Sequence, residues 1–163
     1  MWHGTTVARA IFLLNLFFCI QPISGFAQQG DASRQAAFKT LNTDLAEGNR
    51  LEALTRLEQS GGLDANQISR SICDTAPALR AAALRAGEAF AGKDPDLELR
   101  LIALCNDMAA PVQLQLLKSL PKLHHPKAAV ALRGLIAKLQ SSSDADLRSA
   151  AEAAAKAATP ATP

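Results

Sequence analysis

A helical sequence pattern recurs three times in the second half of the chain and constrains the fold more than any other feature. The pattern starts at Leu79, Val112 and Leu147, so its starts lie 33 and then 35 positions apart. A fixed period of this size is typical of stacked helix pairs, because each pair can bury its apolar face only against the next pair. The period therefore predicts an all-α protein whose antiparallel helix pairs form a short α-α superhelix.

Prolines mark the expected helix starts. Pro77, Pro95, Pro111 and Pro126 stand 18, 16 and 15 residues apart, and proline suits the first turn of a helix but breaks its interior. The spacing predicts helices over about 77–91, 95–108, 111–123 and 126–140, and a fifth from about 143 to 158. Asp94 is a suitable N-cap for the second of these helices, and Ser143 or Asp144 for the last. Pro121 should kink or stop the third helix.

The apolar residues of these segments follow helical spacing. The predicted core faces are Leu97, Leu101, Leu104 and Met108; Val112, Leu116, Leu120 and Leu123; and Ala128, Leu132, Leu135 and Leu139. Upstream, helices are expected over about 33–47, 51–59 and 64–73. Phe38, Leu41 and Leu45 share one face of the first, and Asp64 with Gln67 has the form of a capping box. The segment 33–74 is read as an N-terminal cap or a degenerate repeat.

The repeat resembles HEAT repeats, in particular those of bacterial HEAT-like and phycobilisome-lyase-like proteins, over about residues 75–158. The matching segments are Leu79-Arg80-x-Ala82-Ala83-Leu84, Val112-Gln113-x-x-Leu116-Leu117 and Leu147-Arg148-x-Ala150-Ala151. Gln113 and Gln115 depart from the usual Arg and Ala, and Pro121 from the usual Gly. The resemblance implies a helical solenoid that binds other proteins, and the family has no common catalytic residues. A lyase role toward bilins is a further alternative by family association alone.

Residues 1–27 have the form of a secretory signal peptide. Arg9 precedes an apolar run of about eleven residues that ends before Gln21-Pro22, and small residues Gly25 and Ala27 precede a cut before Gln28. The run is short for a membrane span, which needs about twenty residues. We therefore expect a chain exported to the periplasm or secreted, with no transmembrane span after cleavage. The alternative is an uncleaved N-terminal anchor. Residues 28–158 form the expected single domain, and residues 159–163 a disordered tail.

Basic residues collect in one stretch of a chain whose formal net charge is only +2. No Asp or Glu occurs between Asp107 and Asp144, a stretch that also contains His124 and His125. The candidate partner-binding residues within it are Lys118, Lys122, Lys127, Arg133 and Lys138. Such a face could accept an acidic protein segment or an anionic envelope component. A solvated helix face with no partner is the alternative.

Catalytic and cofactor chemistry finds little support in the sequence. His124-His125 is an adjacent pair, and adjacent residues on a helix do not face one another, so a metal site is not expected. No nucleophile–base arrangement and no phosphate-binding loop is present. The chain contains no Tyr, and exposed aromatic faces are what single-stranded nucleic-acid binding needs. We therefore expect a non-enzymatic interaction or scaffolding module that binds another protein, with no cofactor and no nucleic-acid partner.

Two cysteines follow the expected cleavage site, Cys73 and Cys105. In an oxidising compartment two such thiols often pair. The helices 77–91 and 95–108 would run out and back and bring the two residues to the same level. The sequence therefore predicts a disulfide between them, with two small buried hydrophobic side chains as the alternative.

Overall fold

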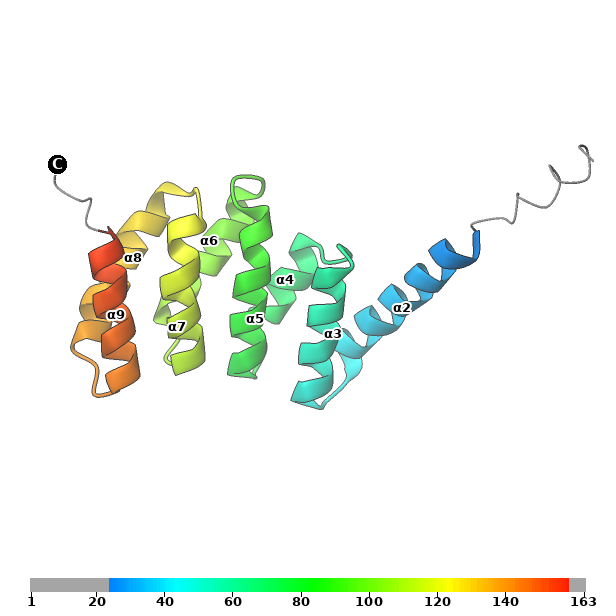
Figure 1. The fold of residues 1–163 in the computed structure, drawn as a ribbon, viewed down its shortest axis with the longest axis horizontal. Coiled ribbons are helices and arrows are strands. Elements are labelled where there is room, and N and C mark those ends of the chain that lie inside the picture. The colour runs from blue at the N-terminus through cyan, green and yellow to red at the C-terminus, as the bar shows by residue number, and fades with distance from the viewer. Residues whose placement is uncertain (1–23, 159–163) are drawn as a thin grey trace, which may run out of the picture.

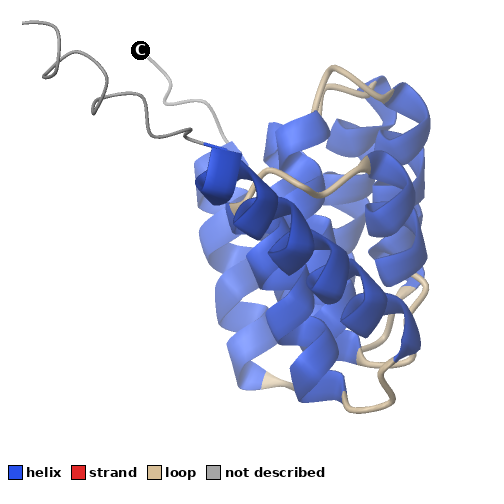
Figure 2. Ribbon diagram, turned by 90° about the vertical axis from the view of Figure 1, so that its right-hand side faces the viewer, coloured by secondary structure: helices blue, strands red, loops and turns tan. Residues whose placement is uncertain are grey.

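The computed structural model describes the backbone of residues 24–158 and the side chains of residues 30–158. All regular structure in this part of the chain is helical, which confirms the all-α prediction (Figure 2). The α-helices are α2 (Ser24–Thr43), α3 (Glu47–Gln59), α4 (Ala65–Ser71), α5 (Pro77–Gly87), α6 (Pro95–Ala103), α7 (Ala110–Ser119), α8 (Pro126–Gln140) and α9 (Ala145–Ala158). Three short 3-10 helices extend α5, α6 and α7: η1 (Glu88–Phe90), η2 (Leu104–Asn106) and η3 (Leu120–Lys122).

The helices lie in two layers (Figure 1). The front layer consists of α3, α5, α7 and α9, each of which contacts the next, and the back layer consists of α4, α6 and α8. Helix α2 runs obliquely away from the N-terminal end and packs on α3. Helices that are neighbours within a layer are therefore two elements apart in sequence, as expected when helix pairs repeat along the chain.

The helix starts that the prolines predicted are confirmed to within one residue. Pro77, Pro95 and Pro126 each occupy the first position of a helix, where the missing N–H has no partner to lose. The Asp94 carboxylate accepts a hydrogen bond from the amide of Leu97 at 2.9 Å. Asp64 and Gln67 form the predicted capping box, and Asp144 caps α9 through the amide of Leu147. Helix α7 ends at Ser119, and Pro121 falls in η3.

One continuous core joins the two layers. It contains every residue of the three predicted apolar faces except Leu104, which is partly buried, and Met108. Burying one leucine side chain contributes about 1.5–3 kcal/mol. Most helices of the stack supply at least two large apolar side chains, whereas the buried residues of α9 are Leu147 and Ala151 alone. Helix α9, like α2 with Ala37 and Leu41, therefore buries only one leucine and one alanine at its contacts.

Three apolar residues that the helical spacing placed on buried faces are exposed instead. Leu45 is 95% exposed because α2 ends at Thr43 and the chain turns there. Met108 is 76% exposed because it follows the end of η2. Phe38 is 42% exposed because α2 packs chiefly on α3 and leaves its other side uncovered. Helix α2 also begins at Ser24 rather than near residue 33.

A polar turn repeats at the entry to each front-layer helix. The side-chain oxygen of Asp44, Asp74, Asp107 or Ser142 accepts a hydrogen bond from the amide two residues later, at 2.8, 2.8, 2.9 and 3.1 Å. These residues lie 30, 33 and 35 positions apart. Asx and Ser/Thr turns of this kind fix the direction in which the chain enters the following helix. The repeat that the sequence indicated therefore has a local structural counterpart at four places.

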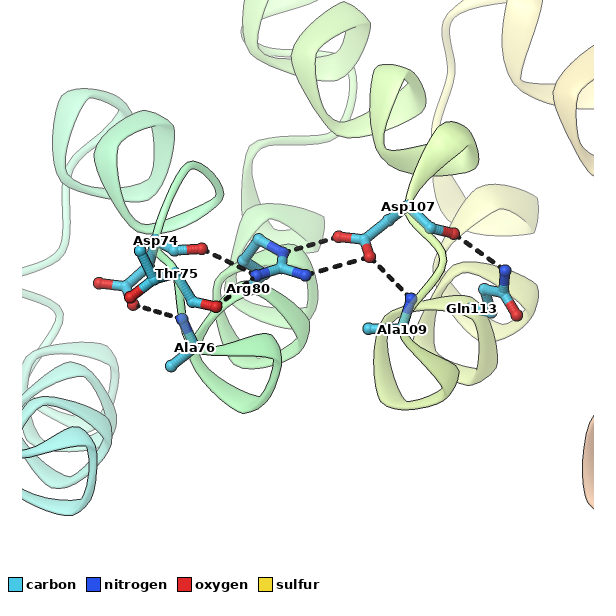
Figure 3. Close-up of polar contacts among 7 residues, drawn as sticks. All are labelled: Asp74, Thr75, Ala76, Arg80, Asp107, Ala109 and Gln113. Carbon is cyan, nitrogen blue, oxygen red and sulfur yellow. Dashed lines mark hydrogen bonds and ion pairs between the residues drawn. The ribbon is translucent and has the colours of Figure 1, made fainter.

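Arginines join successive turns into a ladder, and the link made by Arg80 is drawn in Figure 3. Arg50 donates to Asp74 at 3.0 Å. Arg80, six residues after Asp74, donates to Asp107 through Nε at 2.6 Å and Nη2 at 3.1 Å. Its Nη1 also donates to the carbonyl of Asp74 at 2.9 Å. The Arg80 and Asp107 side chains are only 16% and 11% exposed, so both ions are largely removed from water and depend on each other.

The ladder stops at the junction between α7 and α9. Gln113 stands six residues after Asp107, where Arg80 stands after Asp74, and donates to the carbonyl of Asp107 at 2.9 Å. The next turn begins with Ser142, which has no carboxylate. Arg148 donates to the Ser142 carbonyl at 2.7 Å, so the turn itself is intact. What is missing is the ionic link between this turn and the preceding one.

The predicted disulfide is not formed in this structure. Cys73 and Cys105 are both free thiols, the first exposed and the second half-buried. Cys73 follows α4 on the surface, whereas Cys105 lies in η2 and packs against the core. Burial raises the pKa of the Cys105 thiol, with a smaller opposing effect from Lys138. The expectations for residues 1–23 and 159–163 lie outside the described residues, and residues 24–27 form the first turn of α2.

Candidate interaction surface

The five candidate basic residues do not form a single face. Lys118 is exposed on α7 in the front layer, whereas Lys127, Arg133 and Lys138 are exposed on α8 in the back layer. Lys122 lies in η3 and pairs with Glu88 at 2.6 Å. Only the α8 residues share an element, so the predicted basic stretch divides between the two layers of the stack.

A carboxylate from a distant part of the chain neutralises Lys122. Glu88 lies in η1, and its second oxygen accepts from the Ser119 hydroxyl at 2.6 Å. Gln115 also donates to Glu88 at 3.3 Å and to Ser119 at 2.9 Å. The sequence between Asp107 and Asp144 contains no acidic residue, and Glu88 lies before this stretch, so the charge pattern did not predict the pairing of Lys122 with Glu88. The stacking period is the only signal in the sequence that could have brought the two segments together.

The outer sides of α6 and α8 present a second kind of surface. Both helices begin with proline, and their third and seventh residues are buried in each helix. Leu99 and Val130 are the fifth residues, and Ala103 and Gly134 the ninth, so these pairs occupy equivalent positions on neighbouring helices. We define the α6–α8 outer face as Asp96, Leu99, Arg100, Ala103, Met108, Lys127, Val130, Gly134 and Lys138.

Basic residues are exposed on both layers, and two of the front-layer arginines are paired with carboxylates. In the front layer Arg56 pairs with Glu52, and Arg85 with Glu58, at 2.6 and 2.7 Å. On the α6–α8 outer face Arg100 and Lys127 form no side-chain hydrogen bond or ion pair, and the Lys138 ammonium contacts the Met108 sulfur at 3.5 Å. Asp96 is the one carboxylate on the face. Among the described residues, the outer α6–α8 face therefore carries cations without carboxylate partners.

Arg133 lies apart from this face, at the C-terminal end of the stack. It lines a cavity of about 490 Å³ between α8 and α9. The other lining residues are Ala129, Leu132, Ile136, Ala137, Gln140, Ala155 and Ala158. Leu132 and Ile136 are already buried, so the walls of this cavity are mainly alanine and offer few polar groups that could orient a ligand.

The histidine pair has a structural role. His125 is the N-cap residue of α8, and its Nδ1 accepts from the amide of Lys127 at 3.1 Å. Its own amide donates to Glu98 at 2.6 Å, and the amide of Gly92 donates to the other Glu98 oxygen at 2.6 Å. Glu98 therefore ties the loop after η1 to the loop before α8. Within residues 24–158 no group of three His, Cys, Asp or Glu side chains could hold a metal ion.

The environment of Glu98 keeps this buried carboxylate ionised. The side chain belongs to a residue that is only 2% exposed, and burial alone would raise the pKa of Glu98. The hydrogen bonds from Gly92 and His125, with further help from His124, outweigh burial and hold the pKa below its usual range. A carboxylate held in this way is a clamp between loops rather than an acid–base catalyst, since it has no tendency to take up a proton near neutral pH.

The chain matches no known family, no curated protein and no solved structure in the comparisons made. In the part of the chain that the structure describes, no helix combines the length and the apolar character needed to cross a membrane. The functional argument therefore depends on the stack itself and on the surfaces that its helices present.

Proposed function

We propose that this protein is an exported, non-catalytic helical-repeat module of the HEAT-like type that binds another protein and acts as a scaffold. The observation that carries the proposal is the repeated Asp or Ser turn with its arginine ladder. It gives the α3–α5 and α5–α7 junctions the same kind of arginine–aspartate link between successive front-layer helices. Repeat stacks of this kind offer long surfaces to partners.

The shifted pKa values support a structural use of the polar groups. The hydrogen bond from Arg80 holds the pKa of Asp107 below its usual range, despite partial burial that acts the other way. Glu98 is held ionised between two loops. Functional sites often bring such groups into a cleft that can admit a substrate. Here Asp107 and Glu98 instead form hydrogen bonds that link neighbouring segments of the chain. This arrangement favours a binding role over an enzymatic role, including the lyase role.

A second candidate is an envelope-associated module that binds an anionic component through its basic residues. The unpaired cations Arg100, Lys127 and Lys138 favour it. The two candidates differ in the molecule bound. Binding of a polyanion should fall steeply with ionic strength and be displaced by dextran sulfate. Binding of a protein through an apolar contact should survive that competitor.

The test is chemical cross-linking of the full-length chain in its own cells, followed by purification and mass spectrometry. We expect a mature chain that begins at Gln28 and a defined protein cross-linked to it. Retention of residues 1–27 in a cytoplasmic product would contradict export. Recovery of the chain with no protein adduct, together with displacement from envelope fractions by dextran sulfate, would favour the anionic alternative.

A further inference from the structure

The α6–α8 outer face combines exposed apolar side chains with unpaired cations. Val130 is 61% exposed and Met108 is 76% exposed. They rank among the most exposed large apolar side chains of the described residues, and the contact of Met108 with Lys138 places Met108 beside the exposed side of α8. Single exposed apolar residues are ordinary on protein surfaces. Here, however, the two apolar side chains share one face with lysines, so a partner of this face would meet apolar and cationic groups together.

The two lysines of α8 frame the apolar centre. Lys127 and Lys138 are eleven residues apart, which places them about 16 Å apart along the helix at a rise of about 1.5 Å per residue. Val130 and Gly134 lie between them on the exposed side of α8. A Cβ atom at Gly134 would meet nothing within 4 Å. The missing side chain therefore leaves the α8 backbone open to close approach at the centre of the face.

The charge on the face is not satisfied within the described part of the molecule. Asp107 is near enough to Lys138 for the lysine to help lower the pKa of Asp107, but both of its carboxylate oxygens already accept from Arg80. The Lys138 ammonium meets only the weakly accepting Met108 sulfur. Arg100, Lys127 and Lys138 outnumber the single carboxylate Asp96, so the face has the complementary charge for an acidic partner.

We propose that the α6–α8 outer face is the docking surface for an acidic protein segment that carries apolar side chains between its carboxylates. This inference rests on the proposed function and specifies its partner. An apolar side chain of the segment packs against Val130 and over Gly134, while carboxylates pair with Lys127 and Lys138. Electrostatic complementarity of this kind sets specificity and the association rate more than the affinity.

A protein segment suits this face better than a membrane surface does. Helices that lie on membranes usually insert Trp, Phe or Leu side chains from a broad apolar face. The α6–α8 outer face has no aromatic residue, and its exposed centre is one valine, one methionine and a glycine. Anionic lipid is therefore a competing outcome of the test and not the occupant that the face favours.

The test places a photo-reactive amino acid at Val130 of the full-length chain in its own cells. The matched position is Ala153, which is exposed on α9 in the front layer. We expect a protein adduct at Val130, with the cross-linked peptide rich in Asp or Glu around an apolar residue. The double variant Lys127→Glu/Lys138→Glu should reduce the adduct at least tenfold. The double variant Lys118→Glu/Lys156→Glu makes the same charge change on α7 and α9 and should leave it within twofold.

The outcomes separate this inference from the proposed function. Protein adducts at Ala153 but not at Val130 would overturn the docking surface and leave the scaffold role supported. Adducts to lipid at Val130, or adducts that the Lys127→Glu/Lys138→Glu change does not reduce, would also overturn it. Protein adducts at neither position, nor from the general cross-linker, would contradict the scaffold role itself. Circular dichroism of each purified variant checks that the charge changes leave the helices intact.

Discussion

The junction between α5 and α7 and the junction between α7 and α9 both join successive front-layer helices, but they use different polar links. At the first, Arg80 joins two successive turns through Asp74 and Asp107. At the second, Gln113 reaches only the Asp107 carbonyl, and Ser142 offers no carboxylate. The second junction also buries only Leu147 and Ala151 of α9. Packing alone therefore suffices to place a repeat, and the ionic ladder is an addition that stabilises selected junctions.

The largest expected effect comes from breaking the ladder where it is complete. Arg80→Met keeps the aliphatic stem but removes the guanidinium, which leaves the largely buried Asp107 carboxylate without its main partner. We expect a loss of about 3–4 kcal/mol in the free energy of unfolding, measured by urea denaturation. Arg56→Met is the matched control, because its pair with Glu52 is exposed and should contribute at most about 0.5 kcal/mol. Equal effects of the two changes would contradict the ladder.

The second expected effect concerns Glu98, which links the loop after η1 to the loop before α8. Glu98→Gln replaces one accepting oxygen by an NH2 group that faces a backbone donor, and should cost about 2 kcal/mol. The folded-state pKa of Glu98 is depressed, so its stabilisation is present above the ordinary Glu pKa of about 4.3 and is lost as the pH falls below that value. Denaturation between pH 3 and 7 should therefore show a shallower acid loss in the variant. An unchanged slope would argue against the clamp.

A third, smaller effect is expected from completing the ladder. The double change Gln113→Arg/Ser142→Asp supplies the two groups that the α7–α9 junction lacks. We expect a gain of about 1 kcal/mol over the sum of the single changes, because either group alone lacks its partner. A double-mutant cycle by urea denaturation measures this coupling. Additive single effects would indicate that the geometry of the junction, rather than the missing charges, prevents the link.

The smallest expected effect is a gain in α8. Gly134 lies inside a helix, and a Cβ atom there meets nothing within 4 Å, so Gly134→Ala should stabilise the chain by about 0.5–1 kcal/mol. Gly92→Ala is the contrasting change, because Gly92 has φ +72° and a Cβ atom there would lie 2.6 Å from His124 Nδ1. Thermal unfolding should rise for the first variant and fall for the second.

The helical elements could be predicted from the sequence because their determinants are local. Proline at a helix start, the Asp94 cap and the apolar spacing each act within one turn, and the structure confirms them. The positions that were wrong depend on where an element ends in space. Met108 fits the helical spacing of apolar residues, but it lies beyond the end of η2 and is exposed. Phe38 also fits that spacing, but it lies on the side of α2 that no other described helix covers.

The candidate surface was only partly predictable for the same reason. Lys127 and Lys138 lie on one helix, so their common exposure follows from sequence spacing. The pairing of Lys122 with Glu88 joins residues 34 positions apart and depends on the stacking of α5 beside α7. The ladder was missed because the ionic partner of each arginine is the aspartate of the next turn, more than twenty residues later. Nothing in the local sequence indicates that the two side chains meet.

Native-state hydrogen exchange tests most directly the claim that the linked and unlinked junctions differ. The amides of α5 and α7 around Ala83 and Leu116, both fully buried, should exchange only by extensive unfolding. The amides of α9 around Ala151 should exchange at least tenfold faster, which corresponds to about 1.4 kcal/mol, because α9 can detach without breaking an ionic link. Protection in α9 equal to that in α5 and α7 would contradict this account.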